Sequence, residues 1–384
     1  MDDGVRTKLG PIDETLLLVI LALAIAGVIL VYTASFPSAG RLSAMDGLGD
    51  PYLYLKSQLL YGAVGVLLML GVTRVGPDFL RRCARPFFIV AVALLIAVFT
   101  PLGCELGGSR RWLVICGHSF QPSEFAKIAL VIFLARFLTD KAGELRQFGL
   151  SFRTLGLAGV LALLVLMEPD LGTTAVLVAI ALGMLFLAGA RLWHIGALAT
   201  GTGALAVLFA LGRPYMRERL LAFLDPVAHT QDSGYHVIRM MVALASGGIW
   251  GVGIGEGTEK WFLPARHTDS IYCVLGEEVG LLGCVLLLVL FALFAKRAFD
   301  IALRTPDPFA RLAAGGLTLA ICIQVITNIA VATALLPVTG LTLPFISSGG
   351  SSLAMALLAA GVILSVSRRR APRAQPAPDA GGTA

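Results

Sequence analysis

Charged residues are scarce in this 384-residue chain. They make up 14% of it, whereas hydrophobic residues make up 57%. So low a share of charge excludes an ordinary soluble domain. The apolar residues form recurring runs, each long enough to cross about 30 Å of hydrocarbon. The basic residues, which give a formal net charge of +6, lie at the ends of these runs. They therefore indicate membrane topology and not binding to nucleic acid.

Three other signals are also missing. The six cysteines show no metal-ligand spacing, and no cluster of ligand residues specifies a metal. The glycine-rich run at 247–257 has no strand before it, which excludes a dinucleotide-binding fingerprint. The first apolar run, 15–32, is not followed by a small-residue cleavage site and a soluble domain. We interpret it as a retained membrane span and not as a signal peptide.

The apolar runs predict an all-α polytopic membrane protein with ten transmembrane helices. Most of the 30 basic residues would then lie on the side of the two termini, so the positive-inside rule places both termini in the cytoplasm. A large outer loop, about 212–270, separates the seventh and eighth predicted helices. Residues 1–14 would form a cytoplasmic segment, 15–370 the ten-helix domain and 371–384 a disordered cytoplasmic tail. The predicted spans are 15–33, 57–73, 86–102, 121–138, 154–169, 171–189, 194–211, 271–295, 312–335 and 349–367.

The outer loop holds an ionisable trio, Arg266, His267 and Asp269, directly before an apolar helix. Charge at the mouth of a membrane helix is costly and usually functional. Within the loop, 217–224 predicts a short interfacial helix, and 247–257 fits either a ligand-binding or a flexible loop. The basic residues of this loop violate the positive-inside rule, and there are two explanations. Either the rule does not apply to so long a loop, or these residues face an anionic ligand, which is the explanation that we favour. They are Arg213, Arg217, Arg219, Arg239, Lys260 and Arg266.

Further polar residues lie near the outer ends of the predicted helices. Pro122 and Glu124 suit the first turn of the fourth helix, which places Lys127 about one turn below the outer surface. Lys127 would either snorkel to the interface or face a cavity beside an acidic partner or a bound phosphate. A transporter should concentrate polar residues near the midplane. This distribution instead favours an enzyme that acts at the outer surface on a substrate delivered through lipid.

Four motifs occur along the chain: GGSRRWL with FQPSEFAKIA, EPDLGT, LPARHTDSIYCVLGEE and LTLPFISSGGSS. With these motifs the chain resembles the SEDS family, the FtsW/RodA proteins that polymerise peptidoglycan. The residues of its motifs look more like FtsW than RodA. The resemblance implies a glycosyltransferase of the cytoplasmic (inner) membrane, with undecaprenyl-pyrophosphate-linked glycan as donor and lipid II as acceptor. It also implies a class B penicillin-binding protein, a monofunctional transpeptidase, as a partner, together with other division or elongation proteins.

The resemblance also assigns residues to roles. The family's essential aspartate falls on Asp269, which we expect to be the general base, and Lys127 and Glu124 complete the catalytic set. Cationic side chains would stabilise the leaving pyrophosphate. Whether a divalent ion, Mg²⁺ or Mn²⁺, also takes part stays open. The expected substrate-binding residues are Arg110, Arg111, Trp112, Asp170, Arg217, Lys260, His267 and Ser351.

The chain departs from the family pattern at three places. Ser270 replaces the usual aromatic after the HTD motif, Ser348 replaces a usual Tyr, and the usual GYQ sequence reads Gly234-Tyr235-His236. Two alternative functions stay open: a lipid II flippase, and a non-catalytic scaffold of the division or elongation machinery. Another open alternative concerns Cys104 and Cys116, which flank the arginine motif. They form either a disulfide, which is permitted outside the cytoplasm, or two free thiols.

Overall fold

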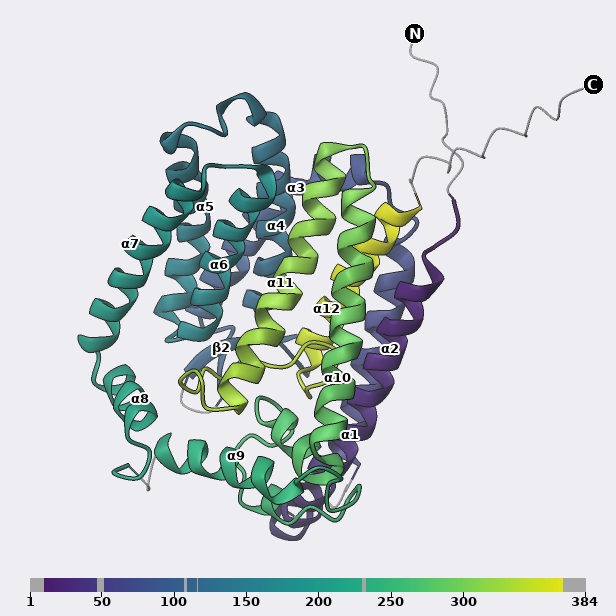
Figure 1. Ribbon diagram of the computed structural model, residues 1–384, viewed down its shortest axis with the longest axis vertical. Coiled ribbons are helices and arrows are strands. Elements are labelled where there is room, and N and C mark those ends of the chain that lie inside the picture. The colour runs from purple at the N-terminus through teal and green to yellow at the C-terminus, as the bar shows by residue number, and fades with distance from the viewer. Residues whose placement is uncertain (1–9, 47–51, 107–108, 116, 230–232, 369–384) are drawn as a thin grey trace, which may run out of the picture.

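The computed structural model describes residues 10–46, 52–106, 109–115, 117–229 and 233–368. These residues form twelve α-helices, two short 3₁₀ helices and one small antiparallel sheet (Figure 1). In chain order the elements are α1 (Glu14–Asp46), α2 (Leu53–Val72), α3 (Pro77–Val98), β1 (Gly103–Leu106), β2 (Ser109–Ile115), β3 (His118–Phe120), α4 (Pro122–Asp140), η1 (Ala142–Glu144), α5 (Phe148–Met167), α6 (Leu171–Ala188), α7 (Leu192–Leu211), α8 (Pro214–Leu224), α9 (Ser233–Gly247), η2 (Glu259–Trp261), α10 (Ile271–Leu303), α11 (Pro308–Ala332) and α12 (Gly350–Ser367).

Ten of these helices, α1 to α7 and α10 to α12, coincide with the ten predicted spans. Eight of them are long and apolar enough to cross a membrane, which makes the chain a multi-pass membrane protein. The other two, α3 and α4, carry more charged residues at their ends. The exact number of ten spans, and with it the place of the outer loop, stays a prediction.

Helix α3 shows why the predicted boundaries differ from the observed ones. Its predicted span begins at Pro86, but the helix begins at Pro77 and continues through Pro86. Arg81, Arg82 and Arg85 end the apolar run without ending the helix, because arginine is a good helix former. Hydropathy therefore locates the apolar part of a helix and misses its charged first turns.

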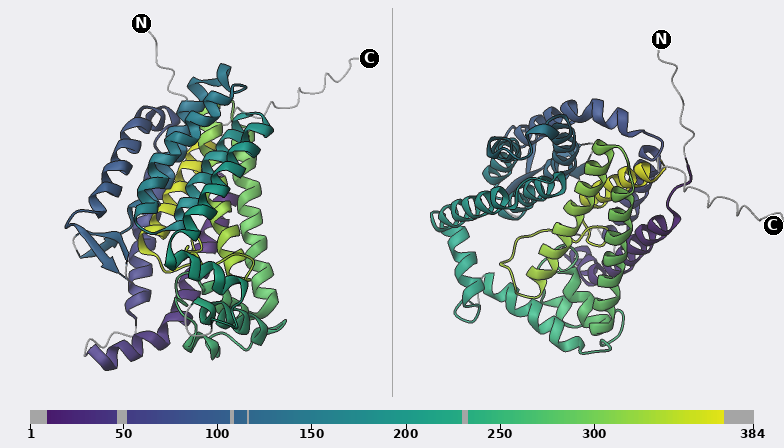
Figure 2. Two further views of the ribbon diagram at one scale, coloured as in Figure 1. Left: turned by 90° about the vertical axis from the view of Figure 1, so that its left-hand side faces the viewer. Right: turned by 45° about the horizontal axis from the view of Figure 1, so that its top comes forward.

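The prediction of an all-α protein missed a small sheet between α3 and α4. Strand β2 pairs with both β1 and β3 in antiparallel register, and Trp112 lies opposite Cys104. The sheet thus carries the arginine motif to the start of α4, at one side of the bundle (Figure 2). Cys104 lies on β1 and Cys116 lies outside the described residues, so the choice between a disulfide and two free thiols stays open.

The first and last described residues meet at one end of the bundle. The Gly10 amide donates to the Arg368 carbonyl oxygen at 2.9 Å, and Arg368 Nε donates back to the Gly10 carbonyl oxygen at 3.0 Å. Helices α8 and α9 lie at the opposite end (Figure 1). This arrangement agrees with an even number of crossings. Helix α8 also agrees with the short helix predicted at 217–224. The expected tail, 371–384, lies outside the described residues.

The glycine-rich run at 247–257 serves as a cap for a break in α10. The helix is interrupted at Gly280, whose φ is 73°. Backbone groups on both sides of such a break lose their helical partners and need others. The glycine loop supplies them, so it is a fixed structural part and not the flexible loop that the sequence also allowed. The four bonds run from Leu281 N to Gly248 O, Leu282 N to Ile249 O, Val252 N to Glu277 O and Gly253 N to Glu278 O.

Replacing Gly280 with alanine should lower the stability of the protein markedly. The new Cβ would lie 2.4 Å from the Gly251 nitrogen, and the left-handed φ alone costs on the order of 1–3 kcal/mol. Gly248→Ala is the matched control, because its φ is 53° but its Cβ would meet open space. The measurement is the midpoint temperature of unfolding in detergent. Equal midpoints for the two variants would contradict the close approach of loop and helix.

Candidate active site

Two polar side chains on α11, Gln324 and Asn328, connect the predicted site residues. They are four residues apart, so they lie on one face of the helix and about 6 Å apart along its axis. Both are buried, at 5% and 1% exposure. Gln324 contacts the lysine of α4, whereas Asn328 contacts the segment that holds Asp269. One helix therefore links the two halves of the expected catalytic set.

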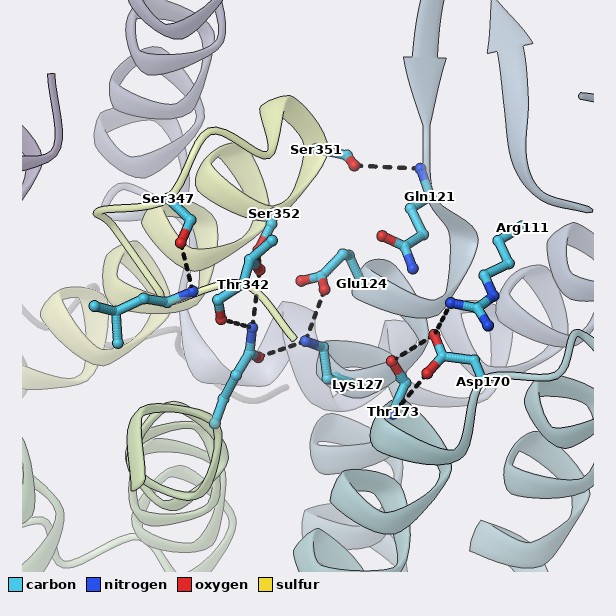
Figure 3. Close-up of polar contacts among 12 residues, drawn as sticks. Arg111, Gln121, Glu124, Lys127, Asp170, Thr173, Thr342, Ser347, Ser351 and Ser352 are labelled. Atoms are coloured by element: carbon cyan, nitrogen blue, oxygen red, sulfur yellow. Dashed lines mark hydrogen bonds and ion pairs between the residues drawn. The ribbon is translucent and has the colours of Figure 1, made fainter. Parts of the chain in front are cut away.

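The first half centres on Lys127. Its Nζ donates to Glu124 Oε1 at 2.9 Å (Figure 3), and it also donates to Gln324 Oε1 at 2.5 Å. Lys127 and Glu124 are only 5% and 6% exposed, so the lysine faces the interior and does not snorkel. Gln324 Nε2 donates to the Thr342 carbonyl at 2.9 Å, which ties the pair to the last motif.

The cavity beside this pair has a volume of about 30 Å³ and is lined by both charged residues, Gln324, Pro344 and Ser352. That is room for about one water molecule. The ion pair is neutral overall, so an anion that approaches Lys127 must compete with Glu124 for the ammonium group.

The second half centres on Asp269. Asn328 Nδ2 donates to the Asp269 carbonyl oxygen at 3.0 Å, and Thr268 Oγ1 donates to Asp269 Oδ1 at 2.6 Å. The last motif adds Ser347 Oγ, which donates to the Thr268 carbonyl at 2.5 Å. Asp269 is half-buried and stands just before the first turn of α10. Its backbone is thus fixed while its side chain stays accessible.

His267 lies against Tyr54 of α2, with ring centroids 4.4 Å apart. Its carbonyl oxygen accepts from the Ser348 amide at 2.8 Å. Burial lowers the pKa of His267, and the neighbouring Arg266 lowers it further, although Asp269 acts in the opposite direction. The neutral imidazole therefore predominates at pH 7.

A third cluster joins the sheet to α6. Arg111 Nε donates to the Glu168 carbonyl oxygen at 2.9 Å, and its Nη1 lies 3.8 Å from Asp170 Oδ2 (Figure 3). Asp170 caps α6 by accepting from the Thr173 amide at 3.0 Å and the Thr173 hydroxyl at 2.9 Å. Asp170 therefore has two roles, because it orients Arg111 and also caps the start of α6.

An apolar groove of about 400 Å³ begins at this cluster. Small residues of α6 and α7 line it, together with Ile323 and Thr327 of α11, and Arg111 and Arg219 belong to its lining. Helices α7 and α8 stand at the left-hand margin of the bundle in Figure 1. The groove thus combines apolar walls with cationic groups, as a lipid with an anionic head requires.

The remaining expected site residues are not all gathered at one point. Ser351 lies at the start of α12 and accepts from the Gln121 amide at 3.2 Å (Figure 3). Arg110 and Arg217 are exposed, and Trp112 is half-buried on β2. Lys260 stands apart, because its Nζ forms a buried ion pair with Glu278 Oε1 at 2.8 Å. A substrate-binding role for Lys260 stays a prediction.

The other basic residues of the outer stretch contact the protein itself. Arg239 pairs with Glu259 at 3.1 Å, Arg219 Nη1 donates to the Val338 carbonyl at 3.2 Å, and Arg266 Nη1 donates to the Lys260 carbonyl. Several of the basic residues that violate the positive-inside rule therefore stabilise the outer part of the protein, whether or not they also bind a ligand.

Three residues at the site were missed by sequence reasoning. Gln324 and Asn328 could have been found, because polar residues four apart in a predicted membrane span usually face the protein interior. His236 could not, because nothing in the sequence indicates that its side chain meets the residue after Asp269.

Comparison with known proteins places these features in a family. The family model FTSW_RODA_SPOVE, described as cell cycle protein, matches residues 13–371. Stage V sporulation protein E of Bacillus subtilis strain 168 is 38% identical over 365 residues, covering 94% of this chain and 98% of the relative. A probable peptidoglycan glycosyltransferase FtsW of Geobacter sulfurreducens (strain DL-1 / KN400) is 38% identical over 362 residues, covering 93% and 95%.

Solved structures agree. A chain of a peptidoglycan synthase complex, reported for its structural coordination of polymerization and crosslinking, matches with a TM-score of 0.75 and 31% identity, covering 94% of this chain and 98% of that one. The rod shape determining protein RodA of Thermus thermophilus matches with a TM-score of 0.69 and 29% identity, covering 94% and 98%. The motifs, the fold and these relatives agree, and the chain belongs to the FtsW/RodA/SpoVE family, as its four motifs predicted.

Proposed function

We propose that this protein is a peptidoglycan glycosyltransferase that polymerises lipid II at the outer face of the cytoplasmic membrane, during division or elongation. The observation that carries the proposal is the link through α11. Gln324 contacts Lys127, Asn328 contacts the Asp269 segment, and the neighbouring Ile323 and Thr327 line the apolar groove. Names of relatives that include peptidoglycan glycosyltransferase support the same activity.

The chemistry follows from the groups at the site. A sugar hydroxyl of the acceptor must attack the anomeric carbon of the donor while the pyrophosphate leaves. A hydroxyl is a poor nucleophile at neutral pH, so the accessible carboxylate of Asp269 would take its proton as general base. Arg111 and Lys127 would stabilise the charge that develops on the leaving pyrophosphate. The ammonium group of Lys127 is already paired with Glu124, so it would have to give up this ion pair in order to bind the pyrophosphate.

The groove suits the lipid part of such substrates. Polyprenyl chains are apolar, and the groove is lined mainly by apolar side chains of α6, α7 and α11. The two arginines, Arg111 and Arg219, would meet the pyrophosphate, because a guanidinium fits phosphate oxygens well. Donor and acceptor both carry this lipid, so the groove would receive one of them while the other approaches Asp269.

The proposal includes a divalent cation, Mg²⁺ or Mn²⁺, which the pyrophosphate of the substrate would bind. Within the described ranges no three His, Cys, Asp or Glu residues come together in a way that would hold a metal ion. We expect EDTA to stop polymerisation and added Mg²⁺ to restore it, as measured by glycan product formed. Unchanged product in EDTA would remove the cation from the reaction.

We also propose that both termini are cytoplasmic, and that the protein acts with a class B penicillin-binding protein and other division or elongation proteins. One structural relative comes from a peptidoglycan synthase complex, which supports a transpeptidase partner. Membrane topology accounts for the basic residues on the side of the termini, and we expect no nucleic-acid partner.

The test is polymerisation of labelled lipid II by the purified protein, with and without its co-expressed transpeptidase. Glycan ladders are the expected product. If no product forms while lipid II crosses the membrane of proteoliposomes, the protein is a flippase. If neither occurs but the complex assembles, it is a scaffold.

A further inference from the structure

His236 of α9 and Ser270 meet beside Asp269, although 34 positions separate them in the chain. His236 Nε2 lies 2.7 Å from Ser270 Oγ. Ser270 follows Asp269 directly, is fully buried and occupies the N-cap position of α10. Helix α9 therefore contacts the segment of the proposed base at the residue directly after Asp269.

The charges around His236 are few. Asp269, in the segment before α10, and Arg219, on α8, act on its ring, whereas Arg239 of the same helix is paired with Glu259. Burial lowers the pKa of His236, and Arg219 lowers it further, while Asp269 raises it. The neutral ring thus predominates at pH 7, and it can share a hydrogen bond with the Ser270 hydroxyl.

We propose that His236 is a positioning residue for Asp269 and makes the reaction of this protein sensitive to acid. The inference rests on the proposed function, in which Asp269 is the general base. Neutral His236 holds Ser270 and so fixes the backbone on which the carboxylate stands. A protonated ring would place a cation beside Asp269. The carboxylate would then be a weaker base, because a nearby positive charge stabilises its ionised form.

The sign of the pH effect follows. Burial and Arg219 lower the pKa of His236 from its ordinary value, so the ring becomes charged only when the pH falls through this lowered pKa. The rate of polymerisation should therefore fall on the acid side, as the ring becomes a cation beside Asp269.

The experiment measures kcat and KM for labelled lipid II between about pH 5 and about pH 9, the range in which histidine titrates. It uses the full chain in complex with its transpeptidase. His236→Ala should lower kcat about 3- to 10-fold at neutral pH with little change in KM, the effect of one lost hydrogen bond. Ser270→Ala should do the same. The double variant should lose no more than either single one, because both remove the same bond.

His236→Gln is the decisive variant. The amide keeps a hydrogen bond to Ser270 and cannot titrate. Its rate at neutral pH should stay within about twofold of the native rate, and its acid loss should move to lower pH. His229→Gln is the matched control, because His229 lies in the same outer stretch and contacts the Asp225 carbonyl. It should keep the native profile.

Two results would overturn the inference. One is a His236→Ala protein with native kcat at every pH, and the other is a His236→Gln protein with the native acid loss, which would assign that loss to another group such as His267. If His236→Ala does not fold, the glutamine profile still decides. A native protein that makes no glycan at any pH would instead refute the proposed function itself.

Discussion

Asp269→Asn should reduce the polymerisation rate by about 10²- to 10⁴-fold, the contribution usual for general acid–base catalysis. Asparagine has nearly the same shape and can still accept a hydrogen bond from Thr268, but it cannot take the proton of the attacking hydroxyl. The Asp269 carbonyl that Asn328 contacts belongs to the backbone and is unchanged. The loss should therefore appear in kcat, with the fold intact.

The measurement is the rate of glycan formation from labelled lipid II by the purified complex. Thermal unfolding of the same preparation is the control, and its midpoint should equal that of the native protein. Asp269→Glu, which keeps the carboxylate but moves it, should recover only part of the rate. A rate near the native one in Asp269→Asn would exclude this residue as the base.

Lys127→Met should lower both activity and stability, and a second change should separate the two effects. Removing the lysine leaves Glu124 buried without its charged partner, which costs about 3–5 kcal/mol of folding free energy. Adding Glu124→Gln removes the stranded charge and should restore most of that stability. The rate should stay about 10²- to 10³-fold low in both variants, because neither has the cation that stabilises the leaving pyrophosphate.

Unfolding midpoints and initial rates of the single and double variants test this separation. Glu124→Gln alone leaves the buried lysine charge without its carboxylate and should be destabilised in the same way. If the double variant regains activity together with stability, Lys127 serves the fold and not the reaction.

The sequence alone was sufficient for most of the architecture. The apolar runs located the ten long helices, because hydrocarbon-length segments are the strongest signal that a membrane protein contains. The start of α4 was also predictable, since Pro122 and Glu124 suit a first turn, and a cavity-facing Lys127 beside an acidic partner was one of the two alternatives for this lysine. Two features were not predicted. One is the charged ends of helices, such as the turns of α3 before Pro86, and the other is the small sheet, whose strands are too short to show an alternating pattern of side chains.

The site was predictable in its chemistry and less so in its assembly. Motifs could name Asp269 and Lys127, but not the side chains on α11 that join them, since the link depends on the packing of distant elements. Lys260 shows what the motifs could not give. As a basic residue in an outer loop it suggested a ligand contact, which stays a prediction, and its charge is buried against Glu278, two positions before the break at Gly280 in α10. Sequence spacing carries no information about such a pairing.

The two faces of α11 link the apolar groove to the residues of the proposed chemistry. Gln324 and Asn328 contact Lys127 and the Asp269 segment, and Ile323 and Thr327, each one position earlier, line the groove. A rigid helix cannot respond to an occupant on one side without moving the groups on the other. If occupancy of the groove alters the site, thermodynamic reciprocity requires that a pyrophosphate at the site alter lipid affinity by the same factor. Release of the spent carrier would then be coupled to the departure of its head group.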